Sequence, residues 1–230
     1  MMSPNYEFSK IYCNYCRANN ITFIYASSSA IYGNSKSCIV NDENEHPHNM
    51  YSWSKWMFDR YIFENLHKFN NRVIGFRFFN VFGIGESHKG KNACIANRFV
   101  KFIQEKGFID LFDEEISRDY VWVEDLVDVL YKTWWNRDVK NGIYNLGGAN
   151  TISHKEIAEL VVDAFISSKK VTGNKEQYIK LTSMPENLKH KFQFYTCAED
   201  LLPYISEITA NNKLKLKHYI ESLVATTQMD

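Results

Sequence analysis

The segment at positions 21–29, "ITFIYASSS", decides the fold of this chain. Its first part is apolar or β-branched, the pattern of a strand buried on both faces of a sheet, and three serines follow where such a strand would end. A second run of this kind, "RVIGFRFFNVFG" at 72–83, comes after a helical pattern at 51–68. Strand, helix and strand with these connection lengths predict a parallel α/β sheet with helices on its faces.

The composition fits a chain that buries a sizeable core. It has 230 residues, of which 45% are hydrophobic, enough for one or two domains. Lys plus Arg and Asp plus Glu both number 27, so no net charge attracts the chain to nucleic acid or anionic lipid, and we expect neither as a partner. No apolar run approaches the roughly 20 residues that span a bilayer, and the first residues lack a signal-peptide pattern. We therefore expect a cytoplasmic protein.

The cysteines and histidines do not suggest a metal site. An odd count of five scattered cysteines fits reduced thiols better than a disulfide framework. Cys13 and Cys16 form a CxxC pair, but neither a preceding strand nor a second pair supports a redox or zinc function. His46 and His48 flank a proline in a polar segment, where solvated side chains are the simpler interpretation. We predict no metal.

The rest of the chain alternates helical and strand patterns. Helices are expected over 6–18 and over 90–107, the second ended by Gly107, and short strands over 108–112 and 142–148. Residues 118–135 look like a strand that runs into a helix, where Trp134 and Trp135 fit packing or interface positions. Ser153 and Glu156 have capping-box spacing at the start of another helix, and the tail is helical.

Polar side chains follow the predicted strands. Ser27 to Ser29, Asn80 and Asn145 lie at or near strand ends, and ligands of open parallel sheets bind at the carboxyl ends of the strands. We therefore expect these residues to line one crevice. Tyr51 opens the helical segment and Lys55 follows at i+4, on the same helix face. An ammonium group favours the phenolate of a neighbouring tyrosine, so this pair suits proton transfer during oxidation of an alcohol, although an ordinary surface pair has the same spacing.

Three motifs resemble the extended short-chain dehydrogenase/reductases that act on nucleotide sugars. They are "YASSSAIYG" at 25–33, "YSWSK" at 51–55 and "GFRFFNVFG" at 75–83, in the order of that family's strand-end serine, catalytic tyrosine and substrate loop. The resemblance implies a Rossmann-like parallel sheet that binds NADP and a smaller α/β substrate domain. A closer resemblance is to members that epimerise an ADP-linked heptose for the lipopolysaccharide core. It is carried by "GESHKGKNACIANRF", "RDYVWVEDLVDV", "GIYNLGGANTIS" and "MPENLKHKFQFYTCAEDL".

The resemblance implies a role for each matching residue. Tyr51 is one acid/base, Lys55 orients the cofactor ribose and activates Tyr51, Ser28 bonds the reacting oxygen, and Lys89 is the second acid/base on the opposite face of the sugar. Hydride leaves one face of the carbon and returns to the other, so each face needs a proton partner. Without the resemblance, a solvated loop lysine would be the simpler interpretation of Lys89.

The implied binding residues form two sets. The cofactor set is Asn5, Lys55, Val81 and Lys89. The ADP-heptose set is Asn80, Lys91, Arg98, Phe112, Asp113, Glu114, Glu115, Arg118 and Phe192. Arginines are natural partners of a diphosphate, although surface ion pairs are their ordinary role.

The chain also departs from the family. It contains no GxGxxG or GxxGxxG turn, which in the family receives the cofactor pyrophosphate, and its first matching residues belong to a mid-domain helix. We therefore expect an N-terminally truncated member whose sheet has an open edge and an uncovered apolar face. Phe192 replaces a usual tyrosine, and Lys91 a small hydroxyl residue.

The expected organisation follows from these matches. Residues 1–83 and 118–150 would form the remaining cofactor domain, and residues 84–117 and 151–230 the substrate domain. Family membership also implies a homo-oligomer. Two alternatives stay open: a catalytically impaired remnant that binds a nucleotide sugar or serves assembly, and a different nucleotide-sugar epimerase or dehydratase.

Overall fold

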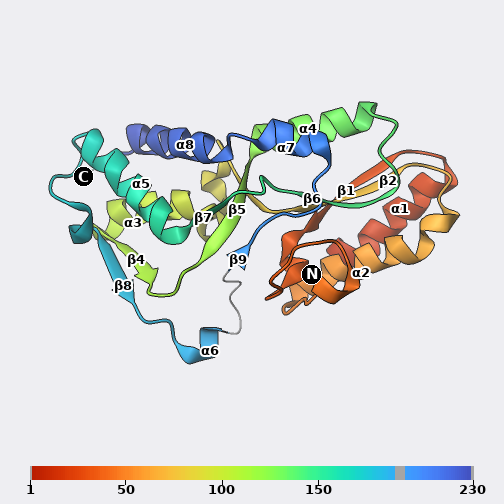
Figure 1. Cartoon of the computed structure of the whole chain (residues 1–230), viewed down its shortest axis with the longest axis horizontal. Helices are drawn as coiled ribbons and strands as arrows, with labels where there is room; N and C mark the ends of the chain where they lie inside the picture. Colours follow the sequence, from red (N-terminus) through yellow and green to blue (C-terminus); the bar gives the residue numbers. More distant parts are fainter. Residues whose placement is uncertain (1, 190–194, 229–230) are drawn as a thin grey trace.

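The computed structural model describes residues 2–189 and 195–228, and its central element is a parallel sheet (Figure 1). Strands β1 (Phe23–Ser28), β2 (Val73–Phe78) and β6 (Gly142–Leu146) pair in the order β1-β2-β6, all parallel. The predicted Rossmann-like α/β class is confirmed. Within the described residues β1 lies at the edge of this sheet.

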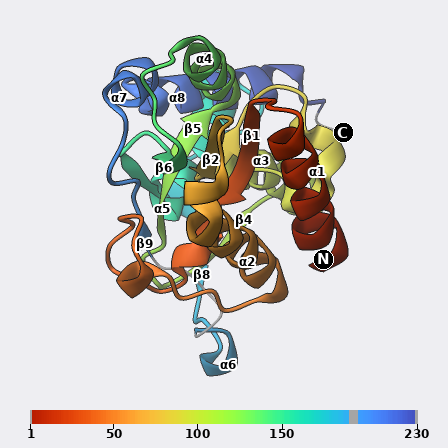
Figure 2. The ribbon, with the colours of Figure 1, turned by 90° about the vertical axis from the view of Figure 1, so that its right-hand side faces the viewer.

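Helices cover both faces of the parallel sheet. Helices α1 (Phe8–Ala18) and α2 (Met50–Asn65) lie on one face, and α4 (Val123–Trp135) and α7 (Pro203–Thr209) on the other (Figure 2). Val73 of β2 packs into the cluster with α1 and α2, whereas Ile74 and Phe76 pack into the cluster with α4 and α7. Burial on both faces explains why β2 is a continuous apolar run rather than an alternating one.

The other strands lie beside a larger helical cluster. β3 (Asn80–Phe82), β5 (Ser117–Trp122), β7 (Thr151–Ser153) and β9 (Tyr195–Thr196) form one sheet, and β4 (Ile109–Phe112) pairs with β8 (Ile179–Thr182). Helices α3 (Ile95–Lys106), α5 (His154–Ser167) and α8 (Asn212–Thr226) pack around a shared apolar core. The short α6 (Glu186–Lys189) follows β8. The division into two domains stays a prediction.

Short helical turns connect the main elements. They are η1 (Ser3–Glu7), η2 (Ser29–Tyr32), η3 (Asp42–Asn44), η4 (Leu66–Lys68), η5 (Glu86–Asn92) and η6 (Lys175–Gln177). No helix among the described residues has the length and hydropathy needed to cross a bilayer. All five cysteines are free thiols, as predicted.

Two predicted elements are wrong in their bounds. The single strand expected over 72–83 breaks at Phe79, whose amide donates to Leu146 O (3.0 Å), and the chain then leaves for a different sheet as β3. The helix expected over 90–107 begins only at Ile95, because Gly90 has a φ of 55° and Ala93 and Cys94 have the extended ψ values of 160° and 147°. Its predicted end at Gly107 is confirmed by a φ of 76°, the left-handed conformation of a helix C-cap.

The predicted capping box at α5 is half formed. Ser153 Oγ accepts a hydrogen bond from the Glu156 amide (3.0 Å). The Glu156 carboxylate instead pairs with Lys213 (2.5 Å), which joins α5 to α8. The cap therefore sets the start of α5 through one hydrogen bond only.

A buried guanidinium holds α2 against the parallel sheet. Arg77 in β2 is fully buried, and its Nε lies 2.9 Å from Asp59 Oδ2 while its Nη2 lies 2.5 Å from Glu45 Oε1. Tyr25 and Ser27 of β1 donate their hydroxyl hydrogens to the same Asp59 carboxylate (3.0 and 2.8 Å). One carboxylate of α2 thus contacts both strands β1 and β2.

We expect Arg77→Met to lower the free energy of unfolding by about 3–5 kcal/mol, because two buried carboxylates lose their counter-charge. Arg60→Met is the matched control: Arg60 pairs with Asp42, whose side chain is 74% exposed, so it should cost less than about 1 kcal/mol. Urea unfolding of both variants measures the difference. Equal losses at the two positions would contradict a stabilising role of the buried cluster.

Candidate active site

The start of helix α2 positions Tyr51 and Lys55. Asn49 Oδ1 accepts from the Ser52 amide (2.9 Å) and Ser52 Oγ accepts from the Asn49 amide (3.1 Å), a reciprocal capping box. Tyr51 therefore lies in the first turn, with 39% of its surface exposed. The Lys55 ammonium is 6.0 Å from the centroid of the Tyr51 ring. The two side chains share one face of α2, as their spacing predicts.

Lys55 also contacts the end of β1. Its Nζ donates a hydrogen bond to Ala26 O (2.9 Å). The Phe23 amide donates to Arg72 O, on the β2 side of β1. Successive residues of a strand direct their backbone groups to alternate edges, so the Ala26 carbonyl, three residues later, points away from β2. Burial lowers the pKa of Lys55, and the Asp59 carboxylate opposes that shift. The ammonium is thus held at the open edge of β1, two residues before Ser28.

Ser28 and Asn80 come from neighbouring strand ends. Ser28 is buried, and its Oγ accepts from the Ala30 amide (3.2 Å), which leaves its hydroxyl hydrogen to donate. Ser28 is opposite Phe78 in the β1–β2 register, and Asn80 follows two residues later. The Asn80 side chain donates to Asp119 O (2.9 Å), which fixes β3 beside β5.

The expected crevice of strand-end residues is partly wrong. Ser27 donates to Asp59 and belongs to the buried cluster around Arg77. Asn145 is fully buried, accepts from the Tyr32 hydroxyl (2.6 Å) and donates to Glu199 O (2.6 Å). Both side chains are engaged inside the protein, so they stabilise the fold instead of lining an open site.

Lys89 lies in η5 beside a buried carboxylate. Glu86 is only 4% exposed and accepts from the Cys94 amide (2.8 Å) and from the Tyr219 hydroxyl (2.8 Å). Lys89 Nζ is 3.8 Å from Glu86 Oε2 and remains 43% exposed. None of the contacts among the described residues joins Lys89 to Tyr51. The neighbouring Lys91 is exposed.

The remaining predicted cofactor and substrate residues lie on different elements. Asn5 donates from its side-chain amide to Ser54 Oγ on α2 (3.1 Å). Val81 of β3 is half-buried against the cluster of α4 and α7. Phe192 lies outside the described residues.

A cavity of about 520 Å³ brings most of the predicted substrate residues together. Arg98 of α3 and the segment from Phe112 to Glu115 line it. The sequence analysis missed other lining residues, chiefly Phe102, Leu181 and the first turn of α5 with Ser153, His154 and Lys155. The helix-start pattern at Ser153 was the available signal, because it places the following histidine at a helix N-terminus.

The Arg98 guanidinium lines the cavity, and the Arg118 guanidinium is near enough to His154 for its charge to act on that ring. Neither has a carboxylate partner within the described residues. Arg98 lies over the Phe102 ring (5.8 Å), and Arg118 donates to Ser117 O (3.0 Å). Burial lowers the pKa of Arg118 to about 10. Such a pair suits an anionic ligand, since the anion would replace the missing counter-charge.

The same two arginines act on His154. Burial, followed by the charges of Arg118 and Arg98, lowers the pKa of His154 to about 3. Two of the carboxylates that line the cavity are engaged elsewhere: Asp113 accepts from Ser183 Oγ (3.1 Å) and Glu114 pairs with Lys189 (3.1 Å). His154 is therefore a neutral imidazole between two cations at neutral pH.

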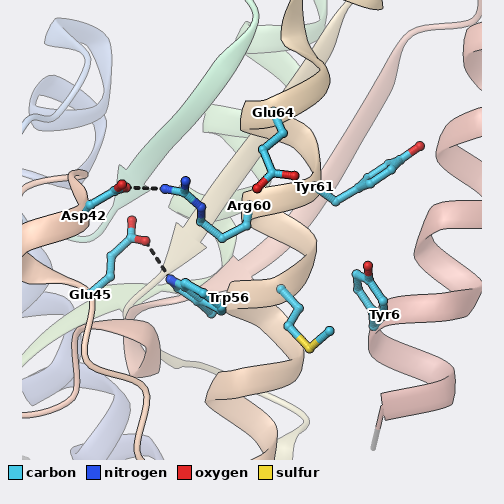
Figure 3. A pocket seen from close by; sticks show the side chains of 8 residues that line it. Tyr6, Asp42, Glu45, Trp56, Arg60, Tyr61 and Glu64 are labelled. Carbon is cyan, nitrogen blue, oxygen red and sulfur yellow. Dashed lines mark hydrogen bonds and ion pairs between the residues drawn. The ribbon is translucent and has the colours of Figure 1, made fainter.

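A second cavity, of about 450 Å³, lies beside α2 and contains no predicted site residue (Figure 3). Figure 3 shows Trp56 bonded to Glu45 and Arg60 paired with Asp42. Glu45 also binds the buried Arg77. The polar groups of this cavity thus serve the connection between α2 and the loop before it.

Comparison with known proteins gives matches to sugar-nucleotide enzymes. The model of the "NAD dependent epimerase/dehydratase family" matches residues 1–147. An ADP-L-glycero-D-manno-heptose-6-epimerase from Alkalilimnicola ehrlichii is 36% identical over 207 residues, which cover 86% of this chain and 61% of that protein. The chain thus spans about three fifths of the length of this curated relative.

Solved structures share the fold. The ADP-L-glycero-D-manno-heptose-6-epimerase of Helicobacter pylori is 26% identical, with a TM-score of 0.67 over 96% of this chain and 65% of that one. A UDP-N-acetylglucosamine 4-epimerase from Methanobrevibacter ruminantium is 18% identical, with a TM-score of 0.77 over 98% of this chain and 70% of that one. The second likeness shows the fold alone.

The lowered pKa of His154 predicts an acid-dependent loss of stability. The unfolded chain binds a proton near the ordinary pKa of 6.5 while the folded chain does not, so stability is fully present above that pH and falls towards pH 3. We expect the stability advantage of the wild type over His154→Gln to shrink by up to about 1 kcal/mol per unit below about pH 6.

Urea unfolding at about pH 7 and about pH 5 measures this change. His218→Gln, which removes an exposed histidine of α8, is the control and should follow the wild type. If the difference in free energy of unfolding between the wild type and His154→Gln is the same at both pH values, His154 is not a neutral, desolvated imidazole.

Proposed function

Because the chain belongs to the NAD dependent epimerase/dehydratase family, we propose that its site serves the epimerisation of an ADP-linked heptose at C6. The reaction passes through a transient ketone and uses NADP, and it supplies a precursor of the lipopolysaccharide core. The similarity to two ADP-heptose epimerases supports this substrate over other nucleotide sugars.

The observation that carries the proposal is the Tyr51–Lys55 pair at the carboxyl end of β1. Lys55 Nζ lies 2.9 Å from Ala26 O and 6.0 Å from the centroid of the Tyr51 ring, so a phenol and an ammonium group share one helix face beside β1. Ser28, with a hydroxyl hydrogen free to donate, follows two residues later on the same strand. Tyr51 then removes the proton of the sugar hydroxyl and later returns it, while Ser28 bonds the same oxygen.

Lys89 supplies the proton partner for the opposite face of the sugar. Its ammonium remains partly exposed in a glycine-flanked turn, and the buried Glu86 lies 3.8 Å away. Inversion needs such a group, because the ketone oxygen faces a different direction once the intermediate has turned over.

The cavity between α3, β4 and α5 holds the ADP part in this proposal. Arg98 and Arg118 pair with the diphosphate, which supplies the counter-charge that both guanidiniums lack among the described residues. The segment from Phe112 to Glu115 and Lys91 complete the nucleotide side, and Asn80 lies towards the sugar.

The residues present fit one end of a nicotinamide cofactor. Lys55 already donates to a backbone carbonyl at an open strand edge, and a ribose hydroxyl is a comparable acceptor. Asn5, Val81 and Lys89 complete the predicted cofactor set. A bound nicotinamide would supply hydride acceptance and return at C6. The sequence contains no glycine-rich turn of the kind that receives a pyrophosphate, so the contacts proposed here are those of the nicotinamide and its ribose.

Tyr51→Phe tests the catalytic proposal. With NADP present, we expect conversion of the ADP-heptose C6 epimer by this chain, followed by NMR, to fall about 100-fold or more in the variant. Tyr12→Phe alters an exposed tyrosine of α1 and should leave conversion unchanged. Equal rates in wild type and Tyr51→Phe would reject Tyr51 as acid/base. Binding of the sugar nucleotide without conversion or NADP binding would favour the non-catalytic alternative.

Arg118→Gln tests the nucleotide site separately from turnover. Loss of a charged partner of the diphosphate should weaken binding of ADP-glucose about 10-fold or more, measured by calorimetry. Arg137→Gln removes an exposed arginine beyond α4 and should bind like the wild type. If Arg118→Gln binds as tightly as Arg137→Gln, Arg118 does not contact the diphosphate.

A further inference from the structure

His154 is fixed at the wall of the cavity that holds Arg98. It is the first residue of α5, and its amide donates to Ile116 O (2.8 Å). Its ring packs edge-on against Phe99, with 6.4 Å between the ring centroids and an angle of 89°. Backbone and ring contacts together define the position of the imidazole between α3, β5 and α5.

The imidazole has no hydrogen-bond partner of its own. The half-buried ring forms no hydrogen bond to protein through either nitrogen within residues 2–189 and 195–228. The ring therefore keeps its hydrogen-bonding capacity for something that enters the cavity.

Basic groups dominate the immediate surroundings of His154. Arg98 faces it from α3 and Arg118 from β5, and both charges act on it. On its own helix, Lys155 lines the cavity and Glu156 is paired with Lys213. The facing segment carries carboxylates, none of which shifts the titration of His154: Asp110, Asp113, Glu114 and Glu115. The charges that act on His154 are thus those of Arg98 and Arg118.

We propose that His154 is a third diphosphate-binding residue, which donates a hydrogen bond to the anion held by Arg98 and Arg118 and takes up a proton when it binds. The inference rests on the proposed function. In the free protein the guanidiniums and the loss of solvent disfavour the imidazolium. A diphosphate offsets both positive charges, so the imidazolium becomes favourable and the proton comes from solvent. No bond of the ligand is broken.

ADP-glucose is the probe, because its diphosphate is esterified at both ends and does not titrate between about pH 5.5 and 8. Calorimetry at about pH 6 in two buffers of different ionisation enthalpy gives the number of protons taken up. We expect about half a proton per site for the wild type and close to none for His154→Gln. His218→Gln should match the wild type. His154→Gln should also bind about 3- to 10-fold more weakly.

The wild-type chain gives a second measurement that needs no variant. The NMR titration of the His154 ring should move to higher pH when ADP-glucose is added. The inference is overturned if the wild type binds ADP-glucose with the same proton uptake as His154→Gln, or if the ring titration does not move. If the wild type does not bind ADP-glucose at all, the proposed nucleotide site itself is wrong, which is a different result.

Discussion

The buried ion cluster around Arg77 is the constraint on which the site depends. A guanidinium in a central strand is costly to desolvate, and it is tolerated because Asp59 of α2 and Glu45 both contact it. On α2, Tyr51, Lys55 and Asp59 are spaced four residues apart, so they follow one helix face. Docking Asp59 onto β1 and β2 therefore also brings Lys55 to the end of β1. The same ion cluster therefore stabilises the fold and positions the Tyr51–Lys55 pair.

The pairing of β3 with β5 connects the two halves of the site. Asn80 begins β3, one residue after the end of β2, and is opposite Tyr120 in the β3–β5 register. Arg118 lies two residues before Tyr120 on β5. Arg118 and the strand-end residue Asn80 thus belong to the same short sheet. The Asn80 side chain reinforces this pairing through Asp119 O.

Local patterns in the sequence predict the parts of this site that lie within one element. The i, i+4 spacing of Tyr51 and Lys55, the strand-end position of Ser28 and the C-cap at Gly107 are of this kind. Arg77 could not be recognised as a buried anchor, because its partners come from a helix and a loop distant in sequence. Asn145 was misplaced for the same reason, since its burial depends on Tyr32 and Glu199. His154 becomes a cavity residue only when α3 and β5 pack against its helix.

The hydrogen bond from Lys55 to Ala26 O joins helix α2 to the unpaired edge of strand β1. The Ala26 carbonyl points away from β2, so any strand that paired with this edge would offer it a backbone amide. That amide would share the carbonyl oxygen, which has two lone pairs, with the Lys55 ammonium. The ammonium has further hydrogens to donate, and a ribose hydroxyl at the edge is a natural acceptor. A single carbonyl at the sheet edge thus links Lys55 of α2 to the hydrogen bonding of β1.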